Sequence, residues 1–242
     1  MVRSHVLYPA ELTAHDKESL TFHKFPKLKS KTLGGFLFSA KFSSRLYNKP
    51  VNLFHFTIYL GCYLLGGFPT GVVLTKRKFG LDVREMGSGN IGATNVTRVF
   101  GWYAGLLVFL IDFLKGYVPL LLIQRFFSSE SPWLLTWSGL ALVCGHCFSP
   151  YLKFKGGKGV ATSLGCLAYL APVGALVGVI VYAIALSVTR ISAVGSLGGV
   201  LALWIYLAVA KIDMPSTVFV LLVSVIVVSR HHENIRRLIK GA

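Results

Sequence analysis

Charged side chains are scarce in this sequence, and acidic ones are the scarcest of them. Charged residues make up 14% of the 242 positions, and only nine residues are Asp or Glu. An average soluble domain carries about 25% charged residues, so the composition argues against a soluble globular protein. The sequence also lacks the strict alternation of apolar and polar residues that a membrane β-barrel needs, because its apolar runs are continuous.

Motifs of nucleic-acid binding are absent, although the net charge is +16. Nucleic acid is therefore not an expected partner. In a membrane protein, an excess of Lys and Arg instead indicates loops that face anionic lipid and the cytoplasm. We expect the basic residues to lie mainly on one side of a bilayer.

Cysteine is rare, and its four occurrences all lie inside apolar stretches. Cys144 and Cys147 have the C-x-x-C spacing of a thioredoxin-type redox pair. Such a pair normally begins a helix after a strand in a soluble domain, whereas this tetrapeptide ends an apolar run. We interpret both as thiols embedded in the membrane.

Long apolar runs dominate the rest of the chain, and several approach the ~20 residues that a helix needs to cross a bilayer. They lie at residues 53–75, 101–123, 133–149, 159–171, 172–189, 191–210 and 214–229. The 159–189 stretch is divided at Pro172, which removes a backbone donor and disfavours helix at the residue before it. The pattern predicts an all-α, polytopic membrane protein with seven transmembrane helices.

Basic residues set the orientation of these helices. With seven spans, the loops after the first, third, fifth and seventh share one side. They collect thirteen basic residues: Lys76, Arg77, Lys78, Arg84, Arg98, Lys153, Lys155, Lys158, Arg190, Arg230, Arg236, Arg237 and Lys240. The other side holds only Arg125 and Lys211. By the positive-inside rule, the N-terminus is outside and the C-terminus is cytoplasmic.

Residues 1–51 differ from the remainder, with nine Lys or Arg, three Asp or Glu and no long apolar run. On the outer side such a basic segment would violate the positive-inside rule. We expect a basic N-terminal extension that is disordered or not native, with a native start near Val51. Residues 52–242 then form the membrane domain.

The first candidate motif is residues 87–98, GSGNIGATNVTR, in the loop after the first span. Glycines allow a backbone to approach an anion closely, and hydroxyl, amide and guanidinium groups add donors. This composition suits a phosphate. A flexible polar turn is the alternative.

The second and third motifs follow the third and seventh spans. Residues 155–162, KGGKGVAT, place two lysines and a glycine pair before a helix start, which is a ready anion site. A lysine-rich interfacial anchor is the alternative. In residues 230–238, RHHENIRRL, helical spacing puts Arg230, His231 and Asn234 on roughly one face. A basic juxtamembrane helix is the alternative there.

Two ionisable residues, Asp112 and Lys115, lie inside the second span at a spacing that allows an ion pair. Charges within a membrane are costly and usually face a functional interior. A functional role and a purely structural pair that fixes helix packing remain open.

Taken in order, the three motifs resemble the cytoplasmic signature of the acyl-phosphate–glycerol-3-phosphate acyltransferases, bacterial integral membrane enzymes that begin phospholipid synthesis. The resemblance covers residues 53–241. It implies an active site at the cytoplasmic surface of the bacterial inner membrane and no cofactor or metal. It also implies acyl phosphate and glycerol 3-phosphate as substrates, the lipid bilayer as a partner, and a soluble enzyme that supplies acyl phosphate.

The resemblance also assigns roles by position. Ser88, Arg98 and Lys158 would bind the phosphate of glycerol 3-phosphate, and His231 and Asn234 would line the reaction centre. The substrate-binding loops would further contribute Gly87, Gly89, Asn90, Gly92, Thr94, Asn95, Gly156, Gly157 and Gly159, the glycine-rich backbones holding acyl phosphate. Supporting roles fall to Asp112, Lys115, Lys155 and Arg230. The family's third motif continues Gly-x-Glu, whereas the given sequence ends at Ala242 after Gly241. Either the sequence is clipped there or that carboxylate is dispensable, and no role is given to it.

The expected chemistry is direct transfer, because acyl phosphate is already an activated mixed anhydride. No Ser or Cys nucleophile is then needed. None of the seven histidines has an Asp five residues on, which argues against a His-x-x-x-x-Asp dyad. The base is left open between His231 and the phosphate of the acceptor. A transporter for a phosphorylated solute and a lipid-binding scaffold are the alternatives in other classes.

Overall fold

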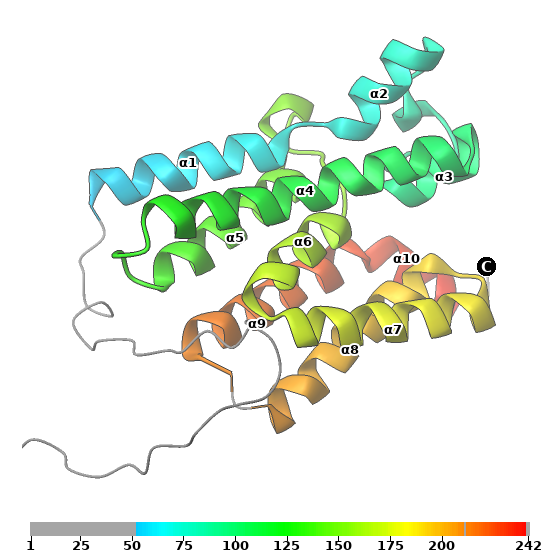
Figure 1. Ribbon diagram of the computed structural model, residues 1–242. Helices are drawn as coiled ribbons and strands as arrows, with labels where there is room; N and C mark the ends of the chain where they lie inside the picture. The colour runs from blue at the N-terminus through cyan, green and yellow to red at the C-terminus, as the bar shows by residue number, and fades with distance from the viewer. Residues whose placement is uncertain (1–51, 211, 241–242) are drawn as a thin grey trace, which may run out of the picture. The chain divides into compact units, whose positions relative to one another are not determined.

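The computed structural model describes residues 52–210 and 212–240, and all regular secondary structure in these ranges is helical. The all-α prediction is confirmed for this part of the chain. The predictions about the extension 1–51 and about residues 241–242 lie outside the described residues. Figure 1 shows the long helices running side by side. Among the longer helices, the main contacts pair α1 (Leu53–Gly67) with α5 (Trp133–Cys147), α4 (Trp102–Phe126) with α6 (Val160–Leu170), α7 (Pro172–Thr189) with α8 (Ser192–Val209), and α5 with α9 (Met214–Arg230).

All seven apolar segments contain a helix, but not all are long enough to cross a membrane alone. Four stretches pass by length and composition: Leu53–Phe79, Trp102–Phe126, Pro172–Thr189 and Ser192–Val209. The bent pair formed by α9 and α10 (His232–Ile239) is a fifth candidate. Helices α5 and α6 have only 15 and 11 residues. The chain is a multi-pass helical membrane protein, and the seven-span path stays a prediction.

Prolines divide the apolar stretches. The predicted break is confirmed at Pro172, where α6 ends at Leu170 and α7 begins. The first predicted segment is also divided, because α1 ends before Pro69 and α2 (Thr70–Phe79) begins after it. Proline cannot donate a backbone hydrogen bond, so both breaks free carbonyl groups for other partners.

Glycines let the helices that carry the motifs approach closely. A Cβ added at Gly145 would lie 2.1 Å from the Tyr63 carbonyl oxygen, which joins α5 to α1. A Cβ at Gly116 would lie 2.2 Å from the Thr162 carbonyl oxygen, which joins α4 to α6. Small residues at helix contacts are typical of membrane bundles. These contacts fix the end of α5 and the start of α6, between which the second motif lies.

Candidate active site

The first motif is a loop organised by one buried side chain, Asn95, in α3 (Ala93–Phe100). Its Oδ1 accepts the Ser88 N–H at 2.9 Å, and its Nδ2 donates to the carbonyls of Met86 at 3.0 Å and Asn90 at 2.9 Å. Asn95 therefore holds the loop together, and its contact with substrate stays a prediction. Gly87 has φ of +58°, and a Cβ there would lie 2.4 Å from the Asn95 Oδ1, so the turn requires glycine.

The glycines at 87, 89 and 92 also match the G-x-G-x-x-G spacing of dinucleotide-binding loops. That fingerprint requires a preceding strand within a βαβ unit. Here the loop follows the 3₁₀ turn η3 (Val83–Glu85), and no strand occurs in residues 52–210 or 212–240. The spacing alone therefore does not indicate a nucleotide site.

The second motif is hydrogen-bonded to the C-terminal end of α5. The N–H groups of Gly156 and Gly157 donate to the carbonyls of Cys147 at 3.1 Å and His146 at 3.0 Å. These two donors are consequently not free for an anion, contrary to the expectation for this glycine pair. The free donors lie one step further on, because α6 begins after Gly159 and its first turn has no side-chain cap. Those N–H groups retain the anion-binding capacity expected of a helix start.

The third motif is bent at its histidine. Helix α9 ends at Arg230, and α10 leaves at 57° to it, with His231 between them. The helical spacing assumed for Arg230, His231 and Asn234 is interrupted, because the backbone of His231 is not helical. Arg230 nevertheless points toward the second motif. Arg230 donates from Nη2 to the Gly156 carbonyl at 2.9 Å and from Nε to the Gly157 carbonyl at 3.1 Å.

Lys158 and Asn234 complete this junction, because the Lys158 ammonium donates to the Asn234 Oδ1. Burial lowers the pKa of Lys158, and the positive charges of Arg237, Arg98 and Arg230 lower it further, against an opposing effect of Glu233. Repulsion of this kind requires the cations to lie near one another. Direct contacts join the second and third motifs, and Arg98 of the first motif lies close enough for its charge to act on Lys158.

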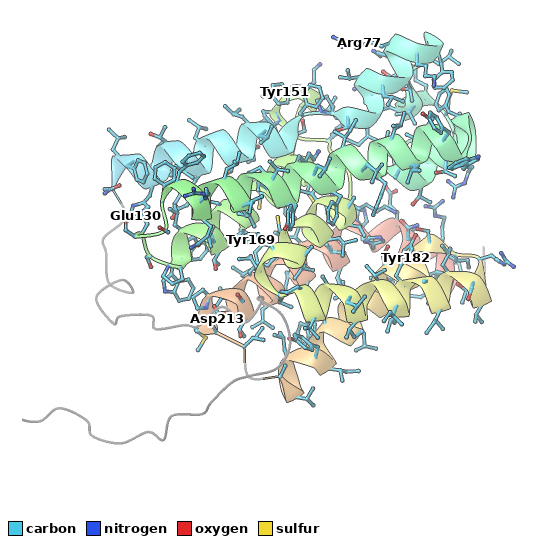
Figure 2. All side chains as sticks on the ribbon, in the orientation of Figure 1. Arg77, Glu130, Tyr151, Tyr169, Tyr182 and Asp213 are labelled. Carbon is cyan, nitrogen blue, oxygen red and sulfur yellow. The ribbon has the colours of Figure 1, made fainter. Side chains whose placement is uncertain are left out.

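Beside this basic cluster lies a cavity of about 650 Å³. It is lined by residues of all three motifs, by Arg84 of η3, and by the turn η4 (Pro150–Leu152) with the residue after it: Arg84, Ser88, Gly89, Asn90, Ile91, Tyr151, Leu152, Lys153, Lys155, Gly156 and Glu233. Figure 2 shows Arg77 and Tyr182 at the opposite end of the helices from Glu130 and Asp213. In Figure 1, the helices α3 and α10 lie toward the same end as Arg77 and Tyr182, so parts of the first and third motifs share one end of the bundle.

The histidine side chains of the third motif differ sharply in environment. His231 is 2% exposed, and its Nδ1 lies 2.7 Å from the Val227 carbonyl, whereas His232 is exposed. A carbonyl accepts only, so Nδ1 carries the proton and Nε2 is free to accept one. Burial lowers the pKa of His231, with the Val227 hydrogen bond opposing and Lys158 adding to the decrease. The imidazole is therefore neutral near pH 7.

Asp112 and Lys115 form the predicted ion pair at 2.8 Å, deep inside the protein. The Asp112 Oδ1 also accepts the Thr70 hydroxyl at 2.8 Å, and the Lys115 ammonium donates to the Phe68 carbonyl at 3.2 Å. The pair thus satisfies groups exposed by the break before α2. The structural interpretation of this pair is supported, and the pair does not line the cavity.

Several residues that the sequence did not single out for the site belong to its surroundings. Arg84, Tyr151 and Lys153 line the cavity without belonging to a motif, and Glu233 lies within the third motif at a position given no role. His146 supports the second motif from α5. In the sequence, the C-x-x-C spacing around His146 indicates a role for the two cysteines and none for the histidine. Only the three-dimensional contacts distinguish it from the other histidines.

Comparison with known proteins identifies the family. A family model described as glycerol-3-phosphate acyltransferase matches residues 56–241. The chain is 46% identical over 183 residues to the glycerol-3-phosphate acyltransferase of Anaeromyxobacter dehalogenans strain 2CP-C, which covers 74% of this chain and 90% of that one. The corresponding enzyme of Aquifex aeolicus is 41% identical over 179 residues, covering 74% and 92%.

Two solved structures have the same fold. They are crystal structures of PlsY (YgiH), an integral membrane glycerol 3-phosphate acyltransferase, in its glycerol 3-phosphate and lysophosphatidic acid forms. The first has a TM-score of 0.72 and 39% identity, and it covers 77% of this chain and 92% of that one. The second has a TM-score of 0.71 and 38% identity. The chain therefore belongs to the glycerol-3-phosphate acyltransferase family.

Proposed function

We propose that this membrane enzyme transfers a fatty acyl group from acyl phosphate to the primary hydroxyl of glycerol 3-phosphate. The products are lysophosphatidic acid and inorganic phosphate. The observation that carries the proposal is the meeting of three distant loops at one polar cavity, where Lys158 is hydrogen-bonded to Asn234 and Arg230 to the carbonyls beside it. Two phosphorylated substrates bring several negative charges, and a cluster of cations with helix-start N–H groups suits them.

The phosphate of glycerol 3-phosphate is assigned to Ser88, Arg98 and Lys158. Arg98 and Ser88 are exposed and come from the first motif, while Lys158 is half-buried in the second. A half-buried lysine beside an exposed guanidinium group supports recognition of a phosphate that arrives from water. Acyl phosphate is assigned to the glycine loop at 87–92 and to the start of α6 after Gly159, where backbone N–H groups lack intrahelical partners.

The reaction needs positioning and charge stabilisation more than a protein nucleophile. The acceptor hydroxyl oxygen forms a bond to the acyl carbonyl carbon, and the bond from that carbon to the phosphate oxygen breaks. The phosphate leaves with the electron pair of that bond, and the hydroxyl proton passes to His231 Nε2 or to the acceptor phosphate. Cations and N–H donors stabilise the negative charge that develops on the carbonyl oxygen.

The orientation in the membrane is part of the proposal. We assign seven spans, an outer N-terminus and a cytoplasmic active site in the bacterial inner membrane. The support is the distribution of thirteen basic residues on one side against two on the other. Single cysteines replacing Ser88, Lys153 and Arg236 should react only with a reagent that reaches the cytoplasmic face. Labelling of any of the three from the outside would overturn the assignment.

Turnover of purified enzyme in detergent tests the function directly. With glycerol 3-phosphate, acyl phosphate should give lysophosphatidic acid and phosphate, whereas acyl-CoA should give none. Product from acyl-CoA alone would overturn the donor assignment. Liposomes that take up glycerol 3-phosphate without turnover would favour a transporter, and a protein that binds lipid without either activity would favour a scaffold.

A further inference from the structure

The glycine pair of the second motif is held from two sides, and one of its supports is a buried histidine with no role in the proposed reaction. His146 is in the last turn of α5 and is 4% exposed. Its Nδ1 is buried and has no hydrogen-bond partner among the described residues. Leaving a buried polar atom unpaired costs free energy, so the ring is not explained by stability alone.

The ring of His146 lies directly against Gly157. A Cβ added at Gly157 would lie 2.2 Å from His146 Nε2, and a Cβ added at Gly156 would lie 2.1 Å from the His146 carbonyl oxygen. The same carbonyl accepts the Gly157 N–H at 3.0 Å. Because no Cβ separates them, the position of the imidazole sets how closely the Gly156–Gly157 backbone approaches α5.

Arg230 closes the other side of the glycine pair. Its guanidinium donates to the carbonyls of Gly156 and Gly157, so both carbonyls and both N–H groups of the pair are hydrogen-bonded. Lys158 follows Gly157 immediately in the chain and is bound to Asn234. A shift of the glycine pair toward or away from α5 would therefore move the Lys158 ammonium with it.

The buried ion pair of Asp112 and Lys115 on α4 lies on the side of the His146 ring away from Gly157. His146 Nδ1 lies 3.9 Å from Asp112 Oδ1, which is too long for a hydrogen bond but close enough for the ring to pack on the carboxylate. Lys115 and Thr70 hold that carboxylate at 2.8 Å each. The ring thus lies between a hydrogen-bonded carboxylate and the glycine backbone.

We propose that His146 is a positioning residue for acyl transfer, whose ring sets the place of the Gly156–Gly157 backbone and through it the place of the Lys158 ammonium. This inference rests on the proposed function. It assigns to His146 no contact with substrate and no proton transfer. A displacement of about 1 Å in a catalytic group can cost about 100-fold in rate, so a residue acting this way has a large effect without touching the substrate.

A double-mutant cycle separates positioning from a general structural role. His146→Ala should lower kcat/KM by about 10- to 100-fold in wild-type enzyme. In a Lys158→Ala background it should lower kcat/KM by less than about twofold, because the group it positions is gone. Equal losses in both backgrounds would overturn the proposal, since a structural defect does not depend on Lys158.

Two variants guard the interpretation. His146→Gln keeps a polar side chain that reaches toward Gly157 and should recover most of the activity lost in His146→Ala; no recovery would count against the proposal. If His146→Ala does not fold, the cycle is run with His146→Leu, which removes the imidazole but fills more of its volume. His55→Ala is the matched control, because His55 is 3% exposed and pairs with Glu130 at 3.3 Å, at the far end of the helices in Figure 2. It should leave kcat/KM unchanged per folded molecule.

Binding measurements keep the inference separate from the proposed function. Calorimetry gives the dissociation constant for glycerol 3-phosphate of the wild type, both single variants and the double variant of the cycle. This measurement needs no turnover. The wild-type enzyme could prove inactive while His146→Ala still weakens binding only when Lys158 is present. That result would refute acyl transfer and support the positioning role. An active wild-type enzyme whose two substitutions act independently would refute the positioning role alone.

Discussion

The Lys158 ammonium is hydrogen-bonded to the Asn234 side-chain oxygen across 76 residues of sequence. The bond joins the second motif to the third at the point where Arg98 and Arg237 also act on Lys158. Holding the amine in one place removes part of the entropy that a free lysine would lose on binding a phosphate. Neither motif alone can therefore provide this site.

Lys158→Ala should nearly abolish turnover while leaving the protein inserted in the membrane. Removing one preorganised charge from a transition-state site costs about 100- to 1,000-fold in kcat. Initial rates with acyl phosphate and glycerol 3-phosphate measure the loss. Lys78→Ala, on the exposed end of α2, is the control and should retain full activity. Activity near wild type in Lys158→Ala would remove this residue from the site.

Arg230→Lys tests whether the geometry of the guanidinium matters beyond its charge. Lysine keeps the charge but cannot reproduce the paired donation from Nε and Nη2 to two adjacent carbonyls. We expect kcat/KM to fall by about tenfold or more, since each lost hydrogen bond loosens the glycine pair. Arg236→Lys, on the exposed side of α10, should have no such effect. An unaltered rate in Arg230→Lys would show that charge alone suffices.

Asn95→Ala should destabilise the first loop and not only lower substrate affinity. The substitution leaves the Ser88 N–H and several carbonyls without their partner. Each buried polar group that loses its hydrogen bond costs about 1–3 kcal/mol. A fall of several degrees in the unfolding temperature, together with loss of activity, is the expected result. Thr97→Ala, exposed on the same helix, serves for comparison.

Acid should inactivate the enzyme if His231 is the base. The pKa of His231 is lowered from its ordinary value of 6.5 by burial, so the neutral, proton-accepting ring persists below that pH. Activity should therefore fall only as pH drops through the lowered pKa. Because the unfolded chain binds the proton more readily, stability should also rise with pH between the lowered pKa and 6.5.

His231→Gln discriminates the two candidate bases. It should lower the plateau rate by about 100-fold or more and remove the acidic limb of the kcat profile. A profile that keeps its acidic limb at a reduced plateau would identify the acceptor phosphate as the base, with His231 in a positioning role. His232→Gln is the paired control, since that ring is exposed.

Cys144→Ser combined with Cys147→Ser should leave activity within about twofold of wild type, since no redox step belongs to the proposed reaction. All four cysteines are free thiols, and Cys147 is fully buried against the second motif. Rates measured with and without a reducing agent should agree for the wild type. A strong loss of activity in the double variant, both with and without the reducing agent, would show that this cysteine pair is needed for the reaction.

Much of the architecture follows from sequence because it depends on local properties. Runs of apolar residues predict the helices, and Pro172 predicts the break between α6 and α7. Glycine and basic residues predict the three loops of the site. The ion pair of Asp112 and Lys115 follows from helical spacing. Each of these inferences needs only residues within a few turns of one another.

The tertiary structure decided which polar groups remain free for substrate. The amides of Gly156 and Gly157 are occupied by the end of α5, the Asn95 side chain is occupied by its own loop, and His146 is placed beneath the second motif. A backbone donor or a buried ring that contacts another part of the protein is not available to substrate. In the second motif these contacts come from α5 and α9. Composition can supply anion-binding groups, but only the packing of distant helices determines which of them still face the substrate.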